Sequence, residues 1–495
     1  MIFFYVILLL VGLILTKSSL FWVYLWQTKE YRLDRFWAEY GYPKKLGRFW
    51  LFSGGRKFHQ PVQTIKSVLI HFISLVVVAL GMFVLLKIFL GGALSNSWLL
   101  IISLIILYLL MPLIVSFNVL IFYIPTVIIK HIIYRLAAKK MRKIGSKERY
   151  NLIVIGITGS YGKSSAKEFL AQILEKKFNV IKTPENVNSE IGVAKFVLKN
   201  VNPSISSGHN EQRVFIVEMG AYKRGEIKRI CDIVKPKIGI ITGIGEQHLA
   251  LFGSIENIKK AKFELIESLP VDGLAVFCGE NKYCLELAEK HEKKKVVCGV
   301  SDANKYVSYT NLPKHYLSNI VAAAEVAKYL GMSDEEIKEA IKNIKLTERM
   351  TKTFTGRNGA LVIDDTYSAN PDGVLAALDY LARQKQKTKI IVMPCLIELG
   401  GAAEEVHHRI GKRIGEVCDL AIITTSDYFS IIKEEAGFVV SSSSRARSRD
   451  SSNQDKSVLV GSPSKAIEFL KDKLNPDTAV LLEGRLAQEI VDFMK

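Results

Sequence analysis

The chain has 495 residues, enough for three domains of ordinary size. Its formal net charge is +19, and the excess lies beside long apolar stretches, which favours an anionic membrane surface over nucleic acid as its partner. The alternative is an ordinary solvated basic surface. The six cysteines form no C-x-x-C pair, so they give no metal signature and fit reduced thiols in a cytosolic domain.

Long apolar runs occupy the first third of the chain, at 1–26, 67–90 and 97–134. About 20 apolar residues cross a bilayer core, so each run can span a membrane. The first run lacks a basic start and a small-x-small cleavage site, which predicts a retained anchor rather than a signal peptide. The alternative is that these are buried helices of a soluble core.

The charge of the connecting segments predicts the topology. Residues 27–66 hold nine Lys and Arg against three Asp and Glu, residues 135–150 hold seven against one, and 91–97 are uncharged. Basic segments stay cytoplasmic. We therefore expect three crossings with the N-terminus outside and the third crossing at 97–118. Residues 119–134 then continue that helix or lie in the interface, because a fourth crossing would put the following domain outside the cell.

From about residue 150 the sequence alternates short apolar strands with amphipathic helices. VFIVEMG, KIGIITGI, LAVFCG, ALVIDDTY, KIIVMP and LAIITT are typical strands, and SNIVAAAEVAKYLG and NPDGVLAALDYLARQ are typical helices. This alternation predicts an α/β fold with parallel sheets covered by helices. A composition break near 345–354 predicts domains at 1–145, 146–349 and 350–495. We expect polar loops at 204–212 and 441–457.

The stretch ITGSYGKSS, residues 157–165, lies between a predicted strand and a predicted helix. The Walker spacing fails, because its first glycine would fall on Ile157. Even so, Gly159 and Gly162 let backbone amides approach phosphate oxygens, Lys163 suits the β- and γ-phosphates, and Ser164 suits Mg²⁺. Ser160 and Ser165 complete the loop. ATP and Mg²⁺ are therefore the expected cofactors; the alternative is a chance glycine-rich turn.

Several motifs in collinear order over about 150–495 resemble the Mur ligase family, in the branch that adds D-alanyl-D-alanine. They are TGSYGKS, TPENVNSEIGV at 183–193, VEMGAYKRGEI at 217–227, the 241–269 segment around HLALFGS and AKFE, HYLSNIVAAAEVAKYLG at 315–331, IDDTYSANPDGVLAAL at 363–378 and LIELGGAAEEVHHRIG at 396–411. The resemblance implies a P-loop-type parallel-sheet ATPase domain followed by a Rossmann-like domain. It also implies ATP-dependent amide formation through an acyl phosphate, with two Mg²⁺ ions.

Cations must be positioned where charge builds up on the γ-phosphate and then on the oxyanion. Glu218 ends a predicted strand and His248 follows another, so both are candidate ligands of a second Mg²⁺. The alternatives are a surface ion pair for Glu218 and a core or surface histidine for His248. The resemblance implies that Lys262 is carbamylated and ligates metal; the alternative is a simple cation facing phosphate.

The resemblance also assigns residues to the nucleotide and the substrates. Asn319 would contact adenine, Arg349 the γ-phosphate and Asp365 the ribose, with Asn370 shaping that loop or forming only a local turn. The substrate-binding set it implies is Asn186, Asn188, Ser189, Glu398, His407 and Arg485.

Three residues depart from the family pattern. Tyr316 stands where an asparagine often follows the histidine, which bears on the adenine contact, and Glu348 replaces the glycine before Arg349. Glu483 replaces the lysine of a Lys-Gly-Ser-Arg segment in the domain that delivers the amine, which leaves the amine open. The usual N-terminal uridine-binding domain has no counterpart. We therefore expect the carboxylate substrate to be a muramoyl peptide or a lipid-linked wall precursor, and the amine to be an amino acid or a dipeptide such as D-Ala-D-Ala.

Two other functional classes remain open from the sequence. An ATP-driven transporter of wall precursors would explain the helices, but the chain has no L-S-G-G-Q signature and little intramembrane charge. A non-catalytic nucleotide-binding scaffold would explain the altered Glu483 segment. Intact Lys163, Ser164 and Glu218 argue for catalysis.

Overall fold

The computed structural model describes residues 2–40, 60–90, 97–145, 151–202, 212–306, 314–347, 350–367, 370–437, 458–460 and 462–495. It divides into two compact units, Met1–Ile132 and Ile133–Lys495, which are taken separately below. Glu348 and Arg349 lie outside the described residues, as do 41–59 of the predicted loop 27–66, 91–96 of 91–97, 204–211 of 204–212 and all of 441–457. Within 27–66, residues Leu33–Tyr40 form a helix, which the prediction of a loop did not include.

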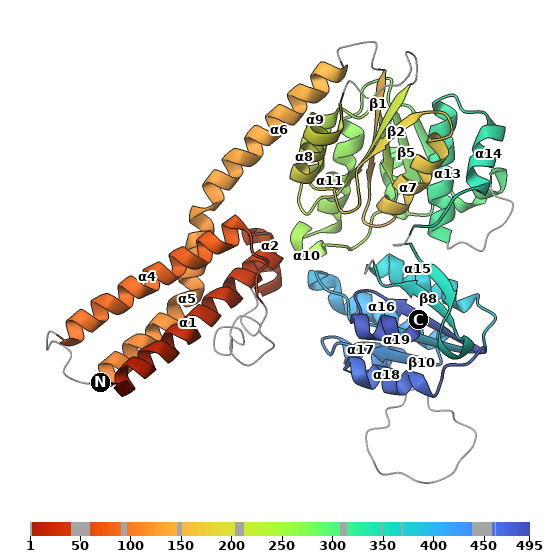
Figure 1. Ribbon diagram of the computed structural model, residues 1–495. Helices are drawn as coiled ribbons and strands as arrows, with labels where there is room; N and C mark the ends of the chain where they lie inside the picture. The colour runs from red at the N-terminus through yellow and green to blue at the C-terminus, as the bar shows by residue number, and fades with distance from the viewer. Residues whose placement is uncertain are drawn as a thin grey trace, which may run out of the picture. The chain divides into compact units, whose positions relative to one another are not determined.

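The first unit consists of α-helices. They are α1 (Ile2–Thr28), α2 (Leu33–Tyr40), α4 (Ile65–Leu90), α5 (Ser97–Ile121) and the start of α6 (Tyr123–Gly145) (Figure 1). Three spans are long and apolar enough to cross a membrane, namely Leu9–Thr28, Ile65–Leu85 and Ile101–Gly145. Their length and composition agree with the predicted crossings, and the third span joins α5 to α6.

Helices α1, α4 and α5 bury one apolar face against each other and expose the other. Trp22, Trp26 and Met111 are buried between them, whereas Phe72 and Phe117 are more than half exposed. Hydrogen bonds also join the helices: Ser19 Oγ to His71 Nδ1 (3.0 Å), Asn118 Nδ2 to Ser74 Oγ (2.9 Å) and Trp26 Nε1 to Ser116 Oγ (3.0 Å). Exposed apolar sides with polar groups turned inward are typical of membrane helix bundles.

Helix α6 runs across the boundary between the two units, and its C-terminal half belongs to the second. Ala137, Met141 and Ile144 are buried in the same apolar cluster as Val193 and Phe215. Lys140 Nζ donates to the carbonyl of Leu198 (2.8 Å) and to Asn202 Oδ1 (2.9 Å). The basic run at 135–150 is therefore helical as far as Gly145 and is part of the core of the second unit.

The first sheet of the second unit has the order β2-β3-β1-β4-β5-β6 and is parallel throughout. Its strands are β1 (Leu152–Thr158), β2 (Asn179–Lys182), β3 (Arg213–Met219), β4 (Ile238–Ile241), β5 (Leu274–Cys278) and β6 (Lys295–Cys298). Its helices are α7 (Lys163–Leu174), α8 (Glu190–Asn200), α9 (Glu226–Val234), α10 (Leu249–Phe252), α11 (Ile255–Glu267), α12 (Lys282–Glu289), α13 (Lys314–Tyr329) and α14 (Asp334–Lys342). Apolar clusters lie on both faces, one under α7, α13 and α14 and the other under α6, α8, α9, α11 and α12.

The second sheet has the order β11-β10-β9-β12-β8-β7. Its strands are β7 (Lys352–Thr355), β8 (Leu361–Asp365), β9 (Thr388–Met393), β10 (Leu420–Ile423), β11 (Val458–Val460) and β12 (Thr478–Glu483). Only β7 pairs antiparallel, at one edge. The helices are α15 (Pro371–Ala382), α16 (Ala403–Val417), α17 (Phe429–Glu435), α18 (Pro463–Lys471) and α19 (Gln488–Met494). Apolar clusters again lie on both faces of the sheet.

The predicted α/β fold with parallel sheets covered by helices is confirmed, and all the strands named from the sequence are present. The two sheets occupy 152–298 and 352–483, on either side of the predicted break. The cysteines are all buried and free, as expected of reduced thiols.

Candidate functional site

The phosphate loop follows β1, a central strand whose neighbours are β3 and β4. The loop therefore lies at the carboxyl edge of the parallel sheet, where ligands of such sheets bind. Gly162 has φ 77°, a left-handed conformation that favours glycine, and it starts α7. Ser160 N donates to the Gly243 carbonyl (2.7 Å), and Ser160 Oγ accepts from Gly245 N (3.1 Å), so the loop is anchored to the segment after β4.

Lys163 folds back over this loop. Its Nζ donates to the carbonyl of Gly159 (2.7 Å) and of Ser160 (3.3 Å). Burial lowers the pKa of Lys163, and the carboxylate of Glu218 partly opposes this. The ammonium group is thus held at the start of α7, where the helix N-terminus also attracts anions.

Glu218 lies at the end of β3, paired in register with Ile157 of β1, and is 3% exposed. Its Oε2 accepts from Ser164 Oγ (3.0 Å) and lies 3.1 Å from Lys167 Nζ. Its Oε1 accepts from Asn188 Nδ2 (3.1 Å). Burial would raise the pKa of Glu218, but the charges of Lys167 and Lys163 outweigh it and hold the pKa below its usual value. The carboxylate is therefore ionised beside the serine predicted to bind Mg²⁺.

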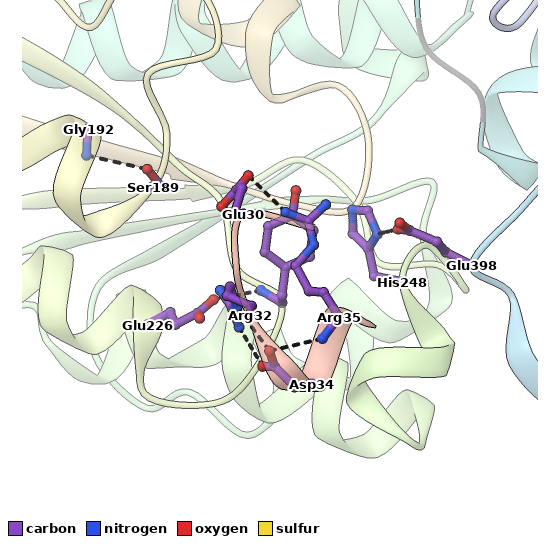
Figure 2. A network of polar contacts seen from close by, with 10 residues as sticks. Glu30, Arg32, Asp34, Arg35, Ser189, Gly192, Glu226, His248 and Glu398 are labelled. Carbon is purple, nitrogen blue, oxygen red and sulfur yellow. Dashed lines mark hydrogen bonds and ion pairs between the residues drawn. The ribbon is translucent and has the colours of Figure 1, made fainter. Parts of the chain in front are cut away.

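The three residues at 186–189 that were predicted to bind substrate differ in what they contact: two bond other residues of the site and one caps a helix. Asn188 contacts Glu218, and Asn186 Oδ1 accepts from Tyr367 Oη of the second sheet's domain. Ser189 is the N-cap of α8, where its Oγ accepts from Gly192 N (3.3 Å) (Figure 2). Ser189 thus has a structural role that its sequence position did not reveal.

His248 and Glu398 face each other from different domains of the second unit (Figure 2). Nδ1 of His248 lies 2.6 Å from Glu398 Oε2, so the ring donates to the carboxylate through Nδ1. Burial lowers the pKa of His248, and the hydrogen bond and charge of Glu398 oppose this. A neutral ring bonded in this way leaves Nε2 as an acceptor, which is the arrangement that metal-binding histidines use.

Lys262 lies on α11 and is 4% exposed. Burial lowers its pKa to about 7, and the charge of Lys163 adds to this while Glu226 and Glu264 oppose it. Lys259, on the same helix, is instead paired with Glu256 Oε1 (2.9 Å) and with Glu286. Only Lys262 of these two lysines has an amine that is partly neutral near pH 7.

The residues predicted to bind the nucleoside are spread over two domains. Asn319 Nδ2 donates to the carbonyl of Gly162 (3.2 Å) and to Ser165 Oγ (2.9 Å), so it supports the phosphate loop. Asp365 ends β8 and is buried. Asn370 is the N-cap of α15, where its Oδ1 accepts from Gly373 N (2.9 Å).

The two remaining residues of the predicted substrate-binding set, His407 and Arg485, differ in their exposure to solvent. His407 is fully buried, and its two ring nitrogens bond the amide of Leu396 (3.0 Å) and the carbonyl of Ala403 (2.6 Å). It therefore holds the loop that carries Glu398 rather than facing solvent. Arg485 is exposed, just beyond β12.

Sequence reasoning missed Lys167 and Thr242. Lys167 is fully buried and pairs with Glu218, and Thr242 Oγ1 donates to the Tyr161 carbonyl inside the phosphate loop. The signal for Lys167 was its position one helical turn after Lys163, on the same face of α7. Nothing in the pattern around Thr242 marked it.

Comparisons with known proteins match the parts that carry this site. The Mur ligase middle domain family matches residues 157–343, and the family described as Mur ligase, glutamate ligase domain matches residues 348–486. The UDP-N-acetylmuramoyl-tripeptide–D-alanyl-D-alanine ligase of Synechocystis sp. is 31% identical over 285 residues, which are 54% of this chain and 61% of that protein. The Mycobacterium tuberculosis protein of that name is 28% identical over 367 residues, 67% of this chain and 70% of that protein.

Solved structures show the same fold. MurF from Acinetobacter baumannii aligns over 74% of this chain and 80% of its own, with a TM-score of 0.59 and 22% identity. MurF ligase from Thermotoga maritima in complex with ADP aligns over 74% of this chain and 83% of its own, with a TM-score of 0.57 and 21% identity. The matched part spans about three fifths of the length of the Synechocystis and Bacillus subtilis relatives.

Proposed function

Because this chain belongs to the Mur ligase family over residues 157–486, we propose that it is a membrane-anchored, ATP-dependent amide ligase of cell-wall precursor synthesis. It would join D-Ala-D-Ala, or a similar amine, to the terminal carboxylate of a muramoyl peptide. The observation that carries the proposal is the cluster of Lys163, Ser164 and Glu218 at the carboxyl edge of the first sheet.

The first step that this cluster supports is phosphoryl transfer from ATP to the substrate carboxylate. The backbone amides of the phosphate loop and the Lys163 ammonium would hold the phosphates in place. The acyl phosphate would then be attacked by the amine, the new C–N bond would form, and inorganic phosphate would leave. Positioned cations stabilise the charge that develops in both steps.

The residues present suit Mg²⁺. Ser164 and Glu218 offer a hydroxyl and an ionised carboxylate 3.0 Å apart, and hard oxygen donors are what Mg²⁺ prefers. His248 Nε2 and a carbamylated Lys262 would complete a second site. When bound, the metal would neutralise the charge of the phosphates. Carbamylation needs a neutral amine, which the lowered pKa of Lys262 provides.

We place the nucleoside between the two domains of the second unit. Arg349 would reach the γ-phosphate and Asp365 the ribose, with Asn319 at the inner end of the site. The carboxylate substrate would bind next to the nucleotide, near Asn186, Asn188 and Glu398. Arg485 would bind the amine substrate. The domain limits of 146–349 and 350–495 are part of this proposal.

The apolar helices of the first unit would determine where in the cell the protein is located. We propose three crossings by α1, α4 and α5, with the N-terminus outside and the catalytic part cytoplasmic. Arg135, Lys139, Arg142 and Lys143 on α6 follow the apolar sequence run 97–134 and would contact anionic lipid headgroups. A substrate attached to a lipid would then be as accessible as one attached to a nucleotide.

Phosphate release by the full chain in detergent tests this function. The assay supplies Mg²⁺-ATP, bicarbonate and UDP-muramoyl tripeptide, with and without D-Ala-D-Ala, and mass spectrometry identifies the product. Phosphate release that needs both substrates, and that Lys163→Ala abolishes, is expected. Turnover only with a lipid-linked precursor would change the substrate. ATP binding without turnover on any amine would contradict the ligase assignment and favour the scaffold, and precursor movement without an amide product would favour the transporter.

A further inference from the structure

A buried set of contacts on helix α13 links the phosphate loop to the start of the second sheet. It begins at Asn319, whose amide nitrogen donates to both Gly162 and Ser165. Tyr316 lies one helical turn earlier on the same face of α13 and is 4% exposed. Because α13 is a continuous helix, the positions of these two side chains are linked rigidly.

The tyrosine hydroxyl is bonded to the segment that joins the two domains. Thr351 N donates to Tyr316 Oη (2.8 Å), and Tyr316 Oη also lies 3.1 Å from Thr351 Oγ1. Thr351 is 5% exposed and immediately precedes β7, the first strand of the second sheet. A single phenol group thus binds both the backbone and the side chain of one linker residue.

Asp365, at the end of β8, also feels the Thr351 side chain, which partly opposes the rise that burial causes in the pKa of its carboxyl. Glu483, at the end of β12, is the register partner of Asp365 and is fully buried. The two hydrogen bonds between Tyr316 and Thr351 lie in a dry environment, where hydrogen bonds are stronger than in water, so this contact resists local distortion.

Two residues that depart from the family pattern have buried side chains in this part of the molecule. Tyr316 belongs to α13 and bonds Thr351 just before β7, whereas Glu483 belongs to β12 and is the register partner of Asp365. Burial, together with Asp365 and Glu483, raises the pKa of Tyr316 to about 12, so the hydroxyl keeps its proton and remains a donor.

We propose that Tyr316 and Thr351 are positioning residues that couple the phosphate loop to the orientation of the C-terminal domain. Nucleotide at the loop would shift Asn319 and, through α13, the Tyr316–Thr351 pair at the start of β7. The inference rests on the proposed function in one respect: if the chain is an amide ligase, the orientation of the C-terminal domain would bring the amine to the acyl phosphate. Neither residue touches substrate or cofactor.

The test removes one hydroxyl at a time from the full chain in detergent. Tyr316→Phe keeps the ring but loses both bonds to Thr351, and Thr351→Val loses the bond between its Oγ1 and Tyr316 Oη. Tyr306→Phe is the matched control, because Tyr306 is also buried and donates to Glu325 (2.9 Å) away from the linker. Thr351→Ser keeps a hydroxyl and should restore the coupling.

Domain orientation is measured by fluorescence energy transfer between dyes on Lys342→Cys and Lys387→Cys, whose parent side chains are 74% and 83% exposed. The native cysteines are all buried, which favours selective labelling at the new sites. Adding Mg²⁺-ATP or Mg²⁺-ADP should change the transfer efficiency in the parent chain and in the Tyr306→Phe and Thr351→Ser variants. Tyr316→Phe and Thr351→Val should lose more than half of that change.

Steady-state kinetics gives the second readout. Tyr316→Phe should lower kcat at least tenfold while the KM for ATP stays within twofold, because the phosphate loop itself is intact. A wild-type response to nucleotide in both Tyr316→Phe and Thr351→Val would overturn the inference, as would a parent chain that shows no response. Loss of coupling in a chain that makes no amide would support the inference and refute the proposed function. If Tyr316→Phe does not fold, the Thr351 pair of variants decides.

Discussion

The Lys167 ammonium lies 3.1 Å from Glu218 Oε2, and both side chains are buried on the inner side of the phosphate loop. The same carboxylate oxygen accepts from Ser164. Lys167 also lies 3.7 Å from Glu168, which is bonded in turn to Lys182. Alternating charges thus hold Glu218 ionised and oriented toward Ser164.

Replacing Lys167 by methionine should leave Glu218 as a buried, poorly compensated charge. Removing one partner of a buried pair costs about 3–5 kcal/mol, so we expect a clear loss of thermal stability and at least a tenfold loss of ATP turnover. The lowered pKa of Glu218 stabilises the fold above the carboxyl's unfolded pKa, and this contribution is lost as pH falls. The variant should therefore show a smaller loss of stability on acidification than the parent chain.

Lys259→Met is the matched control for that variant. Lys259 is also buried, but its partners Glu256 and Glu286 are largely exposed and keep their hydration when the lysine is lost. Differential scanning fluorimetry and phosphate release should show little change. Equal losses of stability and of ATP turnover in the two variants would mean that the Lys167–Glu218 pair contributes nothing specific to the site.

Lys262 should take up carbon dioxide. Its pKa of about 7 means that the neutral amine, which attacks CO₂ to form a carbamate and release a proton, becomes abundant as pH rises through 7. With ¹³C-bicarbonate, carbon NMR should show a carbamate signal at pH 8 that weakens at pH 6. Lys262→Arg should abolish it and Lys259→Arg should not. A signal that persists in Lys262→Arg would assign the carbamate elsewhere.

Gly162→Ala should impair nucleotide binding beyond its effect on the backbone. Gly162 has φ 77°, and an added Cβ would lie 3.0 Å from Asn319 Nδ2. Gly225 offers the control, because it also precedes a helix, has φ 87°, and has no heavy atom within 4 Å of an added Cβ. Both variants should lose about 1–2 kcal/mol from the left-handed conformation. Only Gly162→Ala should weaken ADP binding by calorimetry, by at least tenfold; equal weakening would indicate strain alone.

Glu483 and Asp365 should make the chain less stable as pH rises. Burial raises the pKa of Asp365 to about 7, and burial together with Asp365 raises that of Glu483 well above its usual value. Carboxyl groups with raised pKa values contribute stability below their unfolded pKa, and this is lost as pH rises toward the folded value. Glu483→Gln should raise the melting temperature at pH 8 by about 2–4 °C and change it little at pH 5. A lower melting temperature at pH 8 would show that the ionised form is the stabilising one.

Much of this organisation could be predicted from the sequence because the signals are local. β-branched runs bounded by turns gave the central strands, and Gly162-Lys163-Ser164 between a strand and a helix gave the phosphate loop. Glu218 was placed correctly beside that loop, because the carboxyl ends of parallel strands meet at one edge.

Other features depend on contacts between distant parts of the chain. Lys167 has the sequence context of a surface lysine, and His407 that of a substrate ligand, although both are fully buried. The short edge strands β2 and β7 were not named from the sequence, because an edge position buries less of each strand and their side chains are only partly buried or exposed. The contact between Tyr316 and Thr351 follows from how two domains join, which no local spacing encodes.

Helix α6 removes the usual freedom to separate the apolar helices of the first unit from the core of the second. Ala137, Met141 and Ile144 recur at helical spacing and fill the core of the catalytic unit, while the same helix begins within the apolar span. Burying such side chains contributes about 1.5–3 kcal/mol each for the larger ones, a sizeable part of a domain's net stability. A protease cutting at 146–150 would release an enzyme with an open core, whereas one cutting before residue 133 would release an intact one. Evolution could therefore exchange the apolar helices of the first unit only by joining the new sequence inside α6.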